Sequence, residues 1–487
     1  MRKRFYPTFD MRASVCRTAK GQGCLWKKLS NTGSTFPPLL ENQALVLLDA
    51  GLTSIAADLD RPWDTGDSRL SGLVDVFVSQ FSTPRSIERF LAQLRHYMSM
   101  HVAGEIDATD LFLMTFLHLQ FPELYVNLQS WKTPLTGGSL PMGLLALRDK
   151  QEPPWDDLLV TVAEGRQRAD ARRVLEDLFP AIKDQASNGM KTGPLVSKPE
   201  YFDRYFAHTV PDGDVRNSQL AEALQEGSDP SREAVILGDL LTSTYPGQSA
   251  LALRKLRAST TSESPDVDLR HLVSLELVRK IAGLMEELED GVRSMFSQRN
   301  QAIYWAAELI RQISNEHTPE EILSAVQASP SLRVQMALLT KAARDKNPTV
   351  CKAAQILSTQ VSKDLLQNLA LGDQASEDSP SLSSFLFIAS FGNVADFKNT
   401  ILNGLSTEFD VETLAARFVS QSYIVGINSE PRLNEFDQEL FGKFAPANSS
   451  LYLVPAEQRV DMNDVSWPNR RKFVRGRAKP PVQASSN

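Results

Sequence analysis

The sequence predicts a mainly all-α protein, with a helical bundle followed by a second helical region. Apolar residues recur at spacings of three and four along most of the chain. Several of these segments open with a side chain that can cap a helix, or with a proline in the first turn. The sequence lacks the alternation of strands and helices that a parallel sheet requires.

The best defined helix start lies at Thr83 and Pro84. The Thr83 hydroxyl can accept a backbone N–H that the first turn leaves unpaired, and Pro84 suits the first helical position. The apolar stripe of this helix is then formed by Ile87, Leu91, Leu94 and Met98. Similar stripes predict a helix before it, opening at Asp67 or Ser68, and one after it, capped by Asp107.

Two arginines lie on another face of the Thr83 helix. Arg85 and Arg89 are four residues apart, and Arg85 falls in the first turn. Cations are disfavoured there by the positive end of the helix dipole. Arg85 therefore points to an anionic partner, with a solvated surface arginine as the alternative.

Five short motifs lie roughly between residues 60 and 230: FSTPRSIERF from Phe81, GEID from Gly104, FPELY from Phe121, PEYFDRYF from Pro199 and VPDGD from Val210. Together they resemble the helical portion that follows the nucleotide fold in KAP-type P-loop NTPases. The resemblance implies ATP-driven switching, in some relatives in phage exclusion or membrane-proximal signalling. It also implies that Arg85, with Arg89 beside it, senses phosphate.

The phosphate-binding loop of that family is not found in this sequence. A Gly-x-x-x-x-Gly-Lys-Ser/Thr motif is absent, because Gly442-Lys443 has Asp437 in place of the first glycine and is followed by Phe444. The run from Ala44 to Asp49 is either a Walker B strand or part of a short helix. We therefore expect a truncated, split or degenerate relative that binds no cofactor alone. ATP and Mg²⁺ would come with a nucleotide-binding domain or subunit in trans.

A second helical region follows the Ser/Thr-rich stretch from Ala258 to Ser264. Helix starts at Ser329-Pro330 and Asn347-Pro348 suggest stacked repeats of the HEAT type, and ordinary bundling is the alternative. The predicted organisation is an irregular basic lead or upstream remnant at 1–60, a helical region at 61–230, a linker at 231–264, the second helical region at 265–445 and an irregular basic tail at 446–487.

The predicted tail is basic and carries aromatic residues. Its cations can neutralise phosphates, so nucleic acid or an anionic membrane is a candidate partner, and a solvated disordered tail is the alternative. The candidate partner-binding residues are Arg470, Arg471, Lys472, Arg475 and Arg477. Two functions follow from the sequence: a non-catalytic sensor portion of a KAP-type NTPase, or a free-standing helical scaffold that binds protein or nucleic acid.

Composition narrows the class of protein. The chain has 487 residues, 42% of them hydrophobic, and a formal net charge of -7, which gives no general reason to expect nucleic-acid binding. Its 3 cysteines cannot form a disulfide framework. The sequence shows no membrane-spanning run, secretory signal, HExxH motif or Gly-x-Ser-x-Gly motif. We therefore expect a cytoplasmic protein without a catalytic or metal site of its own.

Overall fold

The structure is a computed structural model, and it confirms the mainly all-α fold class. The chain forms two compact units, each described here by itself. The residues that the structure describes are 39–60, 67–137, 155–183, 193–207, 209–245, 247–261, 269, 271–288, 297–376, 381–405, 408–423, 431–446, 450–456 and 460–479. Within them, no helix is long and apolar enough to cross a membrane.

The first unit is built around a cluster of phenylalanines. Edge contacts join Phe77 to Phe112 and Phe116, and further ring contacts join Phe90 to Phe81 and Phe112. These side chains come from α4 (Val74–Gln80), the turn after it, α5 (Pro84–Met100) and α6 (Ala108–Gln120). The unit also includes α2 (Glu41–Asp58), α3 (Ser68–Ser71), α7 (Pro122–Leu128), α10 (Trp155–Leu158) and α11 (Arg166–Leu178).

The predicted start of α5 is confirmed. The Ser86 backbone N–H donates to the Thr83 hydroxyl at 3.2 Å, which closes the first turn. Leu91, expected in the buried stripe, is only half-buried. It lies against Gly51 of α2, where a Cβ would come within 2.2 Å of Leu91 Cδ1. The run from Ala44 to Asp49 also lies in α2, so it forms a helix and not a Walker B strand.

The second unit begins with short elements. They are η1 (Gln129–Trp131), α8 (Lys132–Leu135), η2 (Pro180–Lys183) and α12 (Arg204–Ala207). A stack of helices in two layers follows. One layer contains α13 (Asn217–Ser228), α17 (Leu275–Leu284), α19 (Pro319–Val326) and α21 (Pro348–Ala370). The other contains α15 (Gln248–Thr261), α18 (Gln298–Ile313), α20 (Leu332–Ala342) and α22 (Ser381–Phe391).

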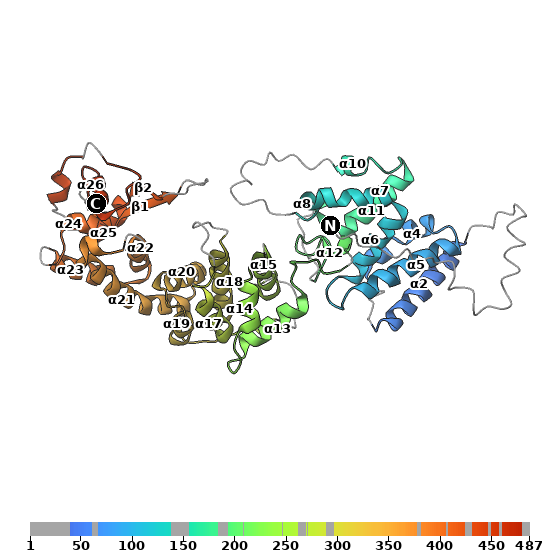
Figure 1. Ribbon diagram of the computed structural model, residues 1–487, viewed down its shortest axis with the longest axis horizontal. Coiled ribbons are helices and arrows are strands. Elements are labelled where there is room, and N and C mark those ends of the chain that lie inside the picture. The colour runs from blue at the N-terminus through green and yellow to red at the C-terminus, as the bar shows by residue number, and fades with distance from the viewer. Residues whose placement is uncertain are drawn as a thin grey trace, which may run out of the picture. The chain divides into compact units, whose positions relative to one another are not determined.

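Contacts between these helices repeat along the stack. Within each layer, every helix packs against the next one, and across the layers α13 contacts α15, α17 contacts α18, α19 contacts α20 and α21 contacts α22. Figure 1 shows the helices following one another from green to orange. A repeated helix pair that touches only its neighbours is the pattern of a helical solenoid. The stack therefore agrees with the repeats suggested by the two proline-marked helix starts.

Local caps explain where several stack helices begin. The Asn347 side chain accepts from the backbone N–H groups of Thr349 and Val350 at the start of α21. Thr318 and Glu321 bond reciprocally at the start of α19, as a capping box does. Ser331 caps α20 through the Val334 N–H.

The linker expected over 231–264 is replaced by helices. These residues contain α14 (Val235–Leu241) and α15, which bury Leu237, Leu241, Leu253 and Leu256 in the core. The Ser/Thr-rich stretch continues α15 as far as Thr261, because the hydroxyls of Ser259 and Thr260 donate to carbonyls four residues earlier. Polar composition alone was therefore a poor guide to a domain boundary here.

The stack ends in a C-terminal module with a phenylalanine-rich core. It contains α23 (Val394–Gly404), α24 (Val411–Ala416), α25 (Gln438–Phe444), η6 (Ser450–Leu453) and α26 (Trp467–Val474). Strands β1 (Val419–Tyr423) and β2 (Pro431–Phe436) pair antiparallel, with Val419 opposite Phe436. The tail expected to be irregular therefore includes a helix, because Trp467, Phe473 and Val474 are buried.

Candidate functional site

The predicted phosphate sensor lies on the surface of the first unit. Arg85 and Arg89 are both exposed on α5. Within the part of the chain that the structure describes, neither side chain has an ion-pair partner. Both guanidinium groups are therefore available to an external anion.

The predicted basic cluster of the tail is largely engaged within the fold. Arg471 pairs with Asp373 at 2.5 Å, and Arg475 pairs with Glu412 at 2.9 Å. Arg470 donates to the Val465 carbonyl at 2.7 Å. Arg477 stacks on Phe473, and Lys472 is exposed. These contacts give the arginines a structural role that their sequence pattern did not reveal.

Arg417 is a buried cation that sequence reasoning missed. Its side chain donates from Nη2 to the carbonyls of Asn368 and Gly372, at 3.1 and 2.8 Å. Its guanidinium carbon lies 3.5 Å from the centre of the Trp467 ring, within cation–π range. Burial, together with the positive charge of Arg470, lowers the pKa of Arg417 to about 9. Arg417 therefore ties the end of α21 to α26.

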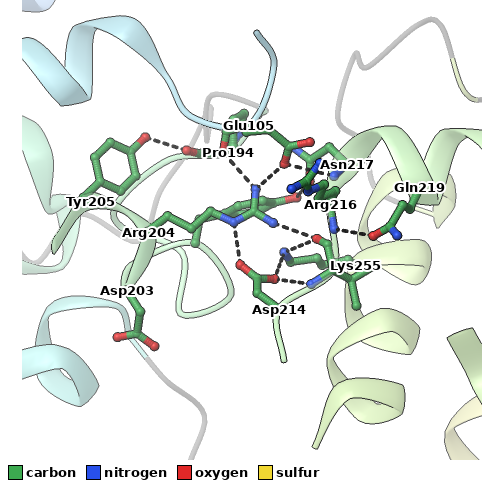
Figure 2. A network of polar contacts seen from close by, with 12 residues as sticks. Glu105, Pro194, Asp203, Arg204, Tyr205, Asp214, Arg216, Asn217, Gln219 and Lys255 are labelled. Atoms are coloured by element: carbon green, nitrogen blue, oxygen red, sulfur yellow. Dashed lines mark hydrogen bonds and ion pairs between the residues drawn. The ribbon is translucent and has the colours of Figure 1, made fainter. Parts of the chain in front are cut away.

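A buried network of ion pairs and hydrogen bonds lies at the start of the helix stack (Figure 2). Arg204 of α12 lies at its centre, and its side chain is 0% exposed. Nη1 donates to Glu105 Oε2 at 2.6 Å, and Nε donates to Asp214 Oδ2 at 2.5 Å. Nη2 donates to the Val215 carbonyl at 2.7 Å. Nη1 also donates to the Glu105 carbonyl at 2.9 Å, so the guanidinium group is held by two carboxylates and two main-chain carbonyls.

Glu105 and Lys255 extend this network to two helices. Glu105 accepts the Asn217 backbone N–H at 3.0 Å, so its carboxylate lies at the positive end of α13. Lys255 of α15 donates to Asp214 Oδ1 at 2.6 Å, and its ammonium lies 4.5 Å from the Tyr201 ring centre. Two buried acids and two buried bases therefore balance in charge.

The shared burial shifts the pKa values of these groups. Burial by itself raises the pKa of Asp214, but hydrogen bonds from Arg204 and Lys255 outweigh it and hold the pKa below its usual value. Burial, joined by the charge of Arg204, lowers the pKa of Lys255 to about 8, although the hydrogen bond that Lys255 donates to Asp214 acts in the opposite direction. Both Lys255 and Asp214 are therefore charged at neutral pH.

Three of the five motifs that carry the family resemblance meet in this network. Glu105 belongs to GEID, Arg204 to PEYFDRYF and Asp214 to VPDGD. Gly213 in the last motif has a φ of +83°, and a Cβ there would lie 2.2 Å from Tyr245 Cε1. Two aromatic residues of PEYFDRYF, Phe202 and Tyr205, are 0% exposed and pack in the core.

The arrangement of the network suits a structural role, in which it joins segments of the chain, and does not suit the binding of a ligand from solvent. Its charged groups are saturated by one another and by main-chain atoms. No group of acidic, histidine or cysteine side chains suited to a metal ion occurs within the described residues. The geometry therefore links the segment around Glu105 to α12, α13 and α15.

Asp214→Asn tests how the stability that the network provides depends on pH. The folded-state pKa of Asp214 is lowered. The charged carboxylate therefore stabilises the fold at pH values above its unfolded-state pKa, and this stabilisation is lost as the pH falls through the folded-state pKa. The variant should have a lower melting temperature than the parent at pH 7, and this difference should shrink as the pH falls below about 4, the usual pKa of an aspartate. Thermal unfolding of both proteins over this pH range measures the difference in melting temperature.

Asp203→Asn is the matched control for this pH series. Asp203 points away from the network in Figure 2 and pairs with Lys132 at 2.6 Å on the surface. Since exposed pairs contribute about 0–1 kcal/mol, we expect a small effect at every pH. If the difference in melting temperature between the parent and Asp214→Asn stayed constant with pH, the Asp214 carboxylate would not contribute to stability as a charged group.

No family model, curated protein or solved structure matches this chain.

Proposed function

We propose that this protein is a helical-repeat scaffold that binds a protein partner along its helix stack. The observation that carries the proposal is the repeated packing of helix pairs from α13 and α15 to α21 and α22. Stacked repeats present extended surfaces and bind other proteins along them. The buried ion network supports this function by anchoring the first helices of the stack. A cytoplasmic location remains part of the proposal.

The test begins with the tagged full chain purified from its native cells together with its partner. The partner and the chain are then produced separately and recombined. We expect a complex of fixed stoichiometry by size-exclusion chromatography with light scattering. Trp305→Ala, which loosens the stack, should weaken the complex, and Arg85→Ala in the first unit should not. Failure of the purified components to recombine would overturn the proposal.

A second candidate function is the sensor portion of a KAP-type NTPase, in phage defence or signalling, that receives phosphate from a nucleotide domain in trans. The exposed and unpaired Arg85 among the described residues supports it. A bidentate contact from Arg85 to a phosphate would supply the interaction energy.

This candidate predicts that ATP binding by the chain alone is undetectable by calorimetry. With a P-loop partner present, the chain should alter ATP hydrolysis, and Arg85→Ala should remove that effect. Arg95→Ala, further along α5 and paired with Asp58, is the control for loss of positive charge. Micromolar ATP binding by the isolated chain, or equal effects of both variants, would contradict it.

A further inference from the structure

One side of the second helix layer concentrates positive charge. The helices concerned are α15, α18 and α20, followed by η4 (Ala343–Asp345). Hydrogen bonds join Gln298 to Ser249 and Gln312 to the Thr260 carbonyl, so α15 and α18 run parallel. We name this side the basic face, and its cations are Arg254, Arg257, Arg311, Arg333, Lys341 and Arg344.

Cross-helix contacts place these residues on one side of the stack. Arg257 of α15 pairs with Glu308 of α18 at 2.5 Å. Lys341 of α20 lies 3.5 Å from the ring centre of Tyr304 on α18. Arg311 of α18 pairs with the η4 residue Asp345 at 3.3 Å.

Helical periodicity places three further cations, on α15, α20 and η4, on the basic face. Arg254 precedes Arg257 by three residues, which is about one turn. Arg333 precedes Lys341 by eight residues, about two turns, and is exposed. Arg344 follows Lys341 by three residues and is also exposed. All three arginines therefore lie on the same side as the residues that make the cross-helix contacts.

The acidic residues of the helices that form this face do not balance its positive charge. Glu308 and Asp345 are the acidic residues of these elements, and both are already paired, with Arg257 and Arg311. The cations without an acidic partner among the described residues are Arg254, Arg333, Lys341 and Arg344. The whole chain carries a net charge of -7, so this local excess runs against its overall composition.

We propose that the basic face binds an acidic segment of a protein partner, an inference that rests on the proposed scaffold function. Charge complementarity selects an acidic ligand. Tyr304 is 41% exposed among the arginines, and tyrosine and arginine are the residues that dominate protein–protein interfaces.

Two features favour a polypeptide over a nucleic acid. Glu308 and Asp345 lie within the basic face, where they would repel the continuous charge of a phosphate backbone. Lys341 already covers the Tyr304 ring, which leaves that ring poorly placed for base stacking. An acidic peptide can place its carboxylates opposite the unpaired cations and its neutral residues opposite the acids.

The test uses the full chain and a fluorescein-labelled glutamate-rich peptide, followed by fluorescence anisotropy. We expect saturable binding that weakens as salt is added, because the contacts are exposed ion pairs. A lysine-rich peptide of equal length should not bind. Binding of the lysine-rich peptide with equal affinity, or no saturable binding of the acidic one, would overturn the proposal.

A matched pair of variants locates the binding. Arg333→Glu with Arg344→Glu reverses charge on the basic face and should weaken binding at least about tenfold. Lys352→Glu with Lys363→Glu makes the same change of charge at exposed sites on α21 and should stay within about twofold of the parent. All four sites are exposed, and unchanged thermal unfolding would confirm that both variants fold.

Three further outcomes test this inference, and the last of them separates it from the scaffold function. If both variants weaken peptide binding equally, the basic face is not the site. If single-stranded RNA binds more tightly than the acidic peptide and the Arg333→Glu, Arg344→Glu variant removes it, the occupant is a nucleic acid and the inference is wrong. A native protein complex that survives this variant would leave the scaffold function standing and remove the basic face from it.

Discussion

Replacing Arg204 with alanine is expected to lower the free energy of unfolding by about 3–5 kcal/mol. The change would leave the carboxylates of Glu105 and Asp214 buried without the guanidinium that bonds them at 2.6 and 2.5 Å. It would also remove a donor from the Val215 carbonyl. Equilibrium urea unfolding followed by circular dichroism measures the loss.

Arg216→Ala is the control for Arg204→Ala, because it removes the same charge from an exposed position beside the network. We expect it to change stability by less than about 0.5 kcal/mol. Combining Arg204→Ala with Glu105→Gln should recover part of the loss, since a buried amide costs less than an unpaired buried carboxylate. Equal effects of Arg204→Ala and Arg216→Ala would show that the network does not stabilise the fold.

Replacing Trp305 with alanine is expected to cost about 3–5 kcal/mol. Trp305 is 0% exposed on α18, and its indole N–H donates to the Thr260 hydroxyl of α15 at 2.8 Å. The substitution opens a cavity between helices that each contact further members of the stack. The loss should therefore appear as a lower urea midpoint for the stack as a whole.

The neighbouring residue provides the control for Trp305→Ala. Tyr304 is 41% exposed, so Tyr304→Ala should cost less than about 1 kcal/mol. Comparable losses for the two variants would contradict the placement of Trp305 in the core and of Tyr304 on the surface.

Features set by a few neighbouring residues could be predicted from the sequence. Thr83 was identified as the cap of α5, and Thr318 and Asn347 also mark true helix starts. A cap depends on residues two or three positions away, so a single sequence contains the whole signal. The stacked repeats were suggested by prolines near two helix starts, but Pro330 precedes the Ser331 cap of α20, whereas Pro348 follows the Asn347 cap of α21.

Contacts between distant residues could not be predicted. The acids that engage the tail arginines lie far earlier in the chain: Asp373 precedes Arg471 by 98 residues, and Glu412 precedes Arg475 by 63. Local sequence therefore showed a run of free cations where the fold has ion pairs. Glu105 and Arg204 are 99 residues apart, and no spacing pattern links them.

Binding of a protein partner along the helix stack is tested most directly by hydrogen exchange of the full chain, measured with and without its purified native partner. We expect slowed exchange in α15, α18 and α20, the helices that carry the basic face. Slowed exchange confined to α5 or α26, with these three helices unchanged, would contradict it.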